Sequence, residues 1–193
     1  MVDYTKLKEK ILSLLEKQLP EELYYHGTHH TLDVLEVCNE YIERDKIQPR
    51  DALLLKTGVL FHDFGFTRSF EDHEKNGATL AEQILPDFGF DGKDIETVKG
   101  LILSTRIPQS PKTELEKIIC DADLDYLGRE DYYPISNTLF EELKSLNKID
   151  DEEAWIDLQI RFLEAHRYHT DFAKENRQPE KAKRLEELRE KCA

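Results

Sequence analysis

Four side chains that could ligate a metal ion stand where the sequence around them predicts burial: His30, His62, Asp63 and Asp123. The pair His62-Asp63 ends a segment, residues 52–61, that is apolar on nearly every side and is therefore expected at the centre of the protein. An imidazole and a carboxylate are costly to bury there unless they are paired or bound. Two imidazoles and two carboxylates suit one divalent ion: Mn²⁺, Fe²⁺, Co²⁺, Ni²⁺, Zn²⁺ or, less well, Mg²⁺.

The choice of the last carboxylate depends on helical register. Asp121, Asp123 and Asp125 lie in one short stretch, and a helix turns about 100° per residue, so Asp123 faces away from the other two. Its face carries apolar residues: Ile119, Ala122, Tyr126 and Leu127. This favours Asp123 as the ligand. Asp121 stays the alternative, because its own face carries Ile118 and the helix could bend or end early near Gly128.

The elements that must position these groups all read as helices. Helical periodicity predicts helices over residues 5–19, 28–44, 49–65, 71–85, 93–105, 113–127, 135–147, 151–174 and 179–191. The connections are short and hold Pro or Gly, and no alternating strand pattern, internal repeat or long linker is present. We therefore expect residues 1–193 to form a single all-α domain of eight or nine helices.

The order of the four residues resembles the H…HD…D signature of the HD-superfamily phosphohydrolases. The likeness extends to a hydrophobic–His-Asp–x-Gly core at residues 60–65, a His-Glu-x-x-Gly-Ala run at residues 73–78, and an alanine before Asp123. It covers about residues 24–128. It implies a compact HD-type helical bundle, completed by residues 130–193, that hydrolyses a phosphoester of a small, nucleotide-like substrate.

The resemblance also implies roles for the site residues. One divalent metal ion, held by the four residues named first, would polarise a phosphoryl oxygen and lower the pKa of a bound water. Asp63 would both ligate the ion and orient that water. The two-metal branches of the superfamily add a histidine pair between the two aspartates, but residues 101–108 contain no histidine, so a second metal is not expected.

Two further histidines are catalytic candidates. His26 lies four residues before His30, a spacing that resembles the Tyr-His-x-x-x-His of cyclic-nucleotide phosphodiesterases, a related branch whose first histidine protonates the leaving oxygen. His26 could be that general acid, or it could merely bond the loop. His73 faces inward and would touch the bound water or the phosphate, or simply fill the core. No recognisable cyclic-nucleotide pocket accompanies the resemblance, so that substrate is not inferred.

Three cations near the motifs are candidates to bind the substrate phosphate: Lys56, Arg68 and Arg106. A solvated surface position is the alternative for both arginines. The polar and aromatic stretch at residues 161–170 could close the pocket over the leaving group. A packing role is the simpler expectation for its aromatic residues and for Trp155.

Charge and composition narrow the partners. The formal net charge is −14, which opposes broad binding to nucleic acids or to anionic membranes. There is no apolar run long enough to span a membrane and no signal peptide, and the three cysteines show no metal-ligand spacing, so we expect a cytoplasmic location. A homo-oligomer is compatible with the sequence but is not predicted by it.

Two other functions compete with hydrolysis. A sensory or scaffolding HD domain would bind metal or nucleotide without turnover, although the full set of four ligands argues against it. A di-iron bundle would need Glu-x-x-His pairs, which the chain lacks.

Overall fold

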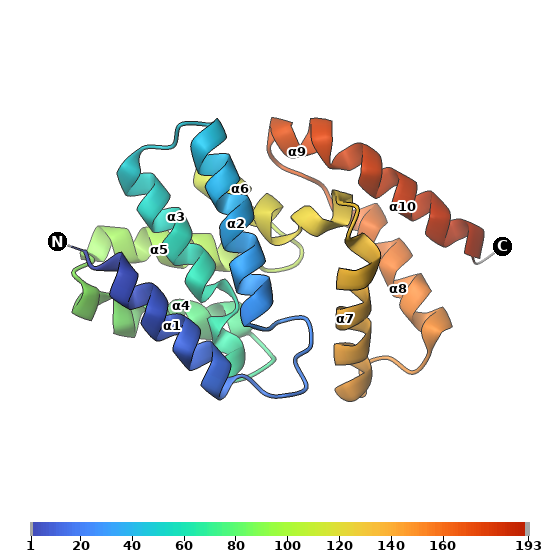
Figure 1. The fold of residues 1–193 in the computed structure, drawn as a ribbon, viewed down its shortest axis with the longest axis horizontal. Coiled ribbons are helices and arrows are strands. Elements are labelled where there is room, and N and C mark those ends of the chain that lie inside the picture. The colour runs from blue at the N-terminus through green and yellow to red at the C-terminus, as the bar shows by residue number, and fades with distance from the viewer. Residues whose placement is uncertain (1, 192–193) are drawn as a thin grey trace.

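The protein is all-helical, as the periodicity predicts. The computed structural model describes residues 2–191, and this part of the chain has no strand. Its α-helices are α1 (Tyr4–Gln18), α2 (Thr28–Arg44), α3 (Pro49–His62), α4 (His73–Ile84), α5 (Gly92–Ser104), α6 (Glu114–Asp123), α7 (Tyr132–Ser145), α8 (Glu152–Ala165), α9 (Asp171–Asn176) and α10 (Gln178–Lys191). Helices α1–α6 form one half of the bundle and α7–α10 the other (Figure 1).

Helix α3 is the central element of the first half. It contacts α1, α2, α4, α5 and α6, and 9 of its 14 residues are buried. Pro49 occupies its first turn, where no intrahelical N–H bond is lost. At Gly58 the neighbouring helix comes so close that an added Cβ would lie 2.9 Å from Cβ of Leu101. This central helix carries His62 at its last position and therefore ends inside the core.

The turn after α3 brings the start of α4 against it. Residues Phe64–Thr67 form a short 3₁₀ turn. A Cβ added at Gly65 would collide with the backbone carbonyl of His73 and lie 2.7 Å from the backbone nitrogen of Gly77. Only glycine permits this approach, and its consequence is that His73, the first residue of α4, lies beside Asp63.

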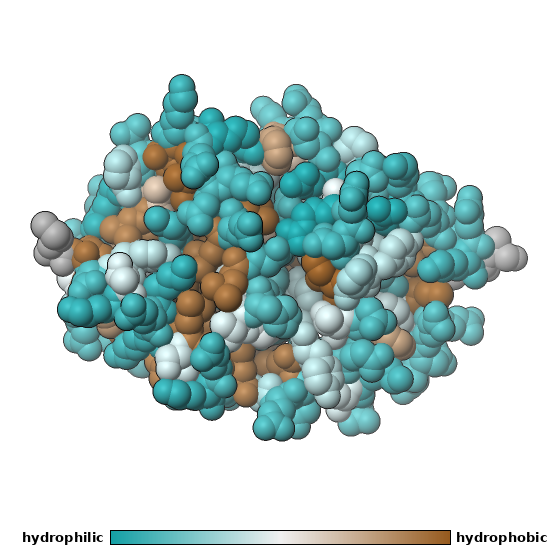
Figure 2. Space-filling view, in the orientation of Figure 1, coloured by the Kyte–Doolittle hydropathy of each residue, from teal (hydrophilic) through white to brown (hydrophobic). Residues whose placement is uncertain are grey.

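Two hydrophobic clusters fill the two halves. The larger one is built from α1–α6 and includes Leu55, Phe61 and Ile119. The smaller one joins Tyr25 and residues 124–132 to the C-terminal helices through Leu163 and Leu188. The face shown in Figure 2 is mostly hydrophilic, with hydrophobic side chains showing mainly between the helices of the first half. This distribution agrees with the strongly acidic composition.

Some helices end earlier than predicted. The third helix ends at His62 rather than near Gly65, and α6 ends at Asp123 rather than at residue 127. The expected helix over 151–174 is two helices, because α8 ends at Ala165 and α9 begins at Asp171. The physical reason for this break is Asp121, whose carboxylate accepts backbone N–H groups between the two helices.

Two of the three cysteines, Cys38 and Cys120, are buried free thiols. Cys192 lies outside the described residues. Among residues 2–191, no helix is both long enough and apolar enough to cross a membrane.

That the whole chain folds as one unit stays a prediction, and unfolding in urea tests it. Trp155 is the only tryptophan and lies on α8, so its fluorescence reports on the C-terminal half, whereas far-ultraviolet circular dichroism reports on every helix. We expect one transition with the same midpoint by both probes, because buried polar contacts join the two halves. Loss of the fluorescence signal at a clearly lower urea concentration would show two separate units.

Candidate functional site

The four predicted metal ligands meet at one point inside the bundle. His30 comes from α2, His62 from the end of α3, and Asp123 from the end of α6; one ligand atom from each lies within 4.8 Å of the others. Nε2 of His30 is 3.1 Å from Oδ1 of Asp123 and 3.3 Å from Nε2 of His62. Asp63 completes the group, with its Oδ2 3.2 Å from Nε2 of His62. The structure thus brings all four together.

Backbone contacts orient His62 as a ligand. Its Nδ1 lies 2.8 Å from the carbonyl oxygen of Val59 and donates to it, so Nε2 is the ring nitrogen that faces the cluster. A metal-bound histidine is typically held in this way, by a second hydrogen bond that fixes its tautomer.

Asp63 supplies a direct test of whether a cation fits. Its Oδ2 is buried and has no hydrogen-bond partner in the described part of the chain, although Nε2 of His62 is near. This geometry, in which Oδ2 of Asp63 and Nε2 of His62 are close but not hydrogen-bonded, is the one expected when both atoms face one ion rather than each other. A buried carboxylate oxygen without a donor needs a positive charge. The donor set of two imidazoles and two carboxylates therefore fits a divalent metal ion.

The neighbouring imidazoles favour the ionised form of both carboxylates of the cluster. Burial tends to raise the pKa of Asp63, but the neighbouring His62 outweighs it and holds the pKa well below its usual range. Burial also opposes ionisation of Asp123, yet hydrogen bonding to His30 and His62 lowers its pKa to about 2. Neither group has to lose a proton before it can bind a cation.

Asp121, the alternative ligand, serves a structural role in this geometry. Its two carboxylate oxygens accept hydrogen bonds from the backbone N–H groups of His169 and Thr170, at 2.8 and 2.7 Å. These bonds hold residues 166–170 in a non-helical connection and explain why the predicted helix over 151–174 is interrupted. The structure places Asp123, and not Asp121, in the cluster with His30 and His62. The function of Asp123 as a metal ligand stays a prediction.

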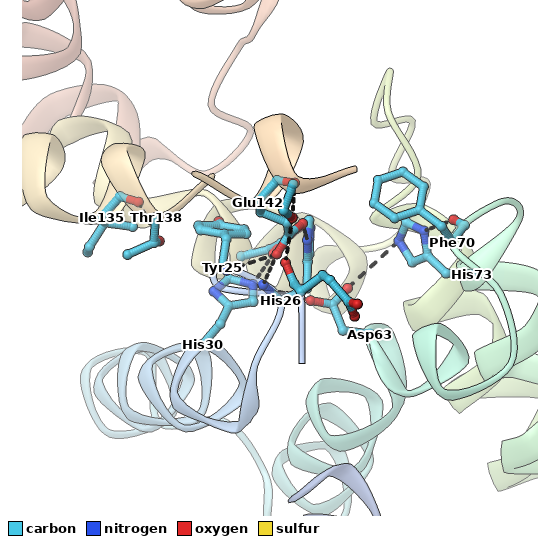
Figure 3. A network of polar contacts seen from close by, with 12 residues as sticks. Tyr25, His26, His30, Asp63, Phe70, His73, Ile135, Thr138 and Glu142 are labelled. Carbon is cyan, nitrogen blue, oxygen red and sulfur yellow. Dashed lines mark hydrogen bonds and ion pairs between the residues drawn. The ribbon is translucent and has the colours of Figure 1, made fainter. Parts of the chain in front are cut away.

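His26 is held beside the cluster by a residue that the sequence analysis did not identify. Glu142, on α7, is completely buried. One of its oxygens accepts the backbone N–H groups of Tyr25 and His26, at 2.8 and 3.0 Å, and the other lies 2.5 Å from Nδ1 of His26 (Figure 3). The bond to Nδ1 leaves Nε2 as the free ring nitrogen of His26, a residue that also lines the cavity described below.

The carboxylate of Glu142 also favours the protonated form of His26. Burial alone would lower the pKa of this imidazole. The hydrogen bond to Glu142 and the charge of Asp63 outweigh burial, so the pKa of His26 is raised. An imidazolium next to a metal-binding site can act as a general acid.

His73 lies on the other side of Asp63. Its Nε2 is 3.7 Å from Oδ1 of Asp63, and its ring stacks on that of Phe66 with the centroids 3.9 Å apart. Nδ1 of His73 lies 3.4 Å from the carbonyl oxygen of Phe70. Figure 3 shows His73 together with Phe70 and Asp63. The neighbouring Glu74, also absent from the sequence-based candidates, is buried and lines the same cavity.

The three cations proposed from the sequence point elsewhere in this structure. The ammonium group of Lys56 lies over the ring of Tyr4 on α1, 5.1 Å from its centroid. The exposed Arg68 donates a hydrogen bond to Gln83, and the half-exposed Arg106 pairs with Asp72 at 3.2 Å. None of these three cations lines the cavity beside the four-residue cluster.

A cavity of about 220 Å³ opens from the four-residue cluster toward the C-terminal helices. Its polar end holds His26, Asp63, His73, Glu74 and Asp123. The opposite walls come mainly from the segment after α6 and from α7 and α8. The first half of the chain therefore supplies the candidate metal ligands, and the second half supplies most of the space beside them.

Comparisons with known proteins agree with this geometry. A sequence model described as the HD domain matches residues 27–125, slightly more than half of the chain, and this segment contains all four residues of the cluster. No curated protein matches the chain.

Among solved structures, the chain is similar to a predicted HD superfamily hydrolase from an uncultured Thermotogales bacterium. The TM-score is 0.56 and the sequence identity 24%, over 84% of this chain and 95% of that one. At this identity the likeness supports the fold alone. The family match, together with the convergence of His30, His62, Asp63 and Asp123 at one buried point, shows that this chain belongs to the HD domain family.

Proposed function

We propose that the protein hydrolyses a phosphoester with the help of one divalent metal ion held by His30, His62, Asp63 and Asp123. The observation that carries the proposal is the convergence of these four groups at the end of a cavity that also presents His26. When bound, the ion would act as a Lewis acid on a phosphoryl oxygen and make a nearby water more acidic. The remaining steps are assigned to the side chains of the protein.

His26 is the proposed general acid. In hydrolysis, water attacks phosphorus, the bond from phosphorus to the leaving oxygen breaks, and that oxygen needs a proton. The imidazolium of His26 can donate this proton from Nε2 because Nδ1 is engaged by Glu142. Glu142 acts through His26 and is a positioning residue: it fixes the ring and raises the pKa of the imidazole.

His73 and Asp63 are proposed to orient the attacking water. Nε2 of His73 and Oδ1 of Asp63 are 3.7 Å apart and line the same cavity, and the stacking of His73 on Phe66 holds its ring in place. Positioning of a nucleophile can account for a large part of a rate enhancement.

The wider biological assignment is part of the same proposal. We expect the substrate to be a small phosphorylated molecule, with a nucleotide as one candidate, and the protein to act in the cytoplasm. Broad nucleic-acid binding is disfavoured by the formal charge of −14.

The ligand assignment is tested by two matched asparagine substitutions in one stretch. Asp123→Asn removes a ligand charge, so metal content after dialysis should fall strongly. Asp121→Asn should keep its metal but lose stability, by roughly 1–3 kcal/mol, because the amide opposes one of two backbone donors. Elemental analysis and thermal unfolding measure the two effects. The reverse ranking in metal content would move the ligand role to Asp121.

Added metal should also stabilise the folded protein, because the complete ligand set exists only in the folded state. At a free Mn²⁺ concentration about 100 times the dissociation constant, the gain should be about 2.7 kcal/mol. Thermal unfolding with Mn²⁺ and with a chelator measures it. His62→Ala and Asp63→Ala should abolish both the gain and hydrolysis. An unchanged melting temperature of the wild-type protein would count against a metal site.

The role of His26 is tested by varying the leaving group. His26→Ala should keep its metal and lower kcat by roughly 10²–10⁴ for an alkyl phosphate, whose leaving oxygen needs a proton. The loss should be much smaller for 4-nitrophenyl phosphate, whose leaving group departs as a stable anion. Glu142→Gln should also lower kcat more for the alkyl phosphate than for 4-nitrophenyl phosphate, but by a smaller factor than His26→Ala. Equal losses on both substrates would remove His26 and Glu142 from this role.

A further inference from the structure

The cavity beside the metal cluster has two chemically different ends. Beyond the charged end, its walls are made mainly of aromatic rings and aliphatic side chains, with Thr105, Ser136 and Gln159 as the neutral polar residues without an aromatic ring. The aromatic residues are Tyr126, Tyr132, Trp155 and Phe162, and Tyr25, whose ring lies beside His30 of the cluster. The aliphatic ones are Ile107, Leu124, Leu127, Leu139, Leu158 and Leu163. A phosphoryl group at the cluster would therefore point its leaving group into apolar surroundings.

The charges along the cavity leave no place for a second anion. The carboxylates that line it are Asp63, Glu74 and Asp123, all at the metal end, and no Lys or Arg of the described chain lines it. A second phosphate or a carboxylate on the leaving group would have to leave water without meeting a cation, which is costly in apolar surroundings. Di- and triphosphates are therefore poor ligands for this cavity.

Two neutral polar groups in the wall, the hydroxyls of Tyr132 and Ser136, do not need a charged ligand either. The hydroxyl of Tyr132 donates to Oε1 of Gln159 at 2.8 Å, and the hydroxyl of Ser136 donates to the carbonyl oxygen of Tyr133 at 3.3 Å. These groups already have partners within the protein. The wall can therefore accept an apolar surface without leaving these oxygen atoms unpaired.

Two exposed hydrophobic side chains on the cavity wall strengthen the inference. Within the described residues, five large hydrophobic side chains are exposed, and two of them, Ile107 and Leu158, line this cavity, with 52% and 37% of their surface accessible. Exposed apolar groups next to a concave site are typical of surfaces that a ligand covers.

We infer that the substrate carries a single phosphoryl group on an uncharged, aromatic leaving group, which fills the cavity between the metal cluster and the side chains of Ile107 and Leu158. Only the phosphoryl end of this inference rests on the proposed function. The apolar end rests on the walls of the cavity alone, so binding can test it without turnover.

Phosphonates provide this test, because their carbon–phosphorus bond is not hydrolysed by a phosphoesterase. Phenylphosphonate and methylphosphonate share the same headgroup and differ in the aromatic ring. We expect the Zn²⁺-loaded protein to bind phenylphosphonate roughly 10- to 100-fold more tightly, because the ring leaves water for an apolar wall. Trp155 lines the cavity and is the only tryptophan, so its fluorescence should respond to the phenyl ligand. Calorimetry gives the affinities independently.

A charged analogue and a pair of matched variants sharpen the result. In the wild-type protein, 4-carboxyphenylphosphonate should bind at least about tenfold more weakly than phenylphosphonate, since its carboxylate meets no cation. Leu158→Arg should narrow or reverse this difference. Leu103→Arg is the control, because Leu103 is similarly exposed, at 43%, but does not line the cavity. It should leave the wild-type preference unchanged.

The outcomes separate this inference from the proposed function. Equal affinities for phenyl- and methylphosphonate, or a wild-type preference for the carboxylated ligand, would overturn the inference even if the protein hydrolyses phosphoesters. Tight phenylphosphonate binding that is weakened in its charged analogue would support it. If the same protein then failed to hydrolyse phenyl phosphate, the proposed hydrolysis would be wrong while the class of ligand would stand.

Discussion

The structure depends on a cluster of charge that the protein interior cannot hold by itself. Two ionised carboxylates and two imidazoles meet where α2, α3 and α6 converge, and one carboxylate oxygen of Asp63 has no donor among the described residues. The penalty for burying unpaired ions is several kcal/mol each. The proposed divalent cation would remove this penalty and would explain why His62 and Asp63, rather than apolar residues, stand at the end of the central helix α3.

The two halves of the chain contribute differently to the site. The segment from α2 to α6 provides the candidate metal ligands, and close packing at Gly58 and Gly65 holds its helices in place. The C-terminal helices provide no residue of the metal cluster but supply Glu142 and much of the cavity wall. In the proposed function, the first half would supply the chemistry, while the second half would position His26 and select the leaving group.

Helical periodicity in the sequence correctly predicted which side chains of the cluster point into the core. His30, His62 and Asp123 lie on apolar helix faces, and those faces point inward, so their convergence could be expected. Glu142 could not be found in the same way, because its partner His26 is 116 residues away and only the tertiary fold brings them together. The one available signal was its spacing of three residues from Leu139, which lines the cavity.

The break after Ala165 has the same kind of cause. Residues 151–174 carry a helical pattern, but Asp121 accepts hydrogen bonds from two backbone N–H groups within that stretch. Asp121 precedes these two residues by 48 and 49 positions in the sequence. The directions of Lys56, Arg68 and Arg106 are likewise set by neighbours on other helices or turns. Sequence spacing indicates that a cation is near a motif, but not which way its long side chain turns.

The most direct test of this account is the anomalous difference density of crystals grown with Mn²⁺. The account predicts one strong peak, at about 2.0–2.3 Å from Nε2 of His30, Nε2 of His62 and a carboxylate oxygen of each of Asp63 and Asp123. A peak bound instead by Asp121, or no peak between the two histidines at a metal concentration that saturates the protein in solution, would contradict it.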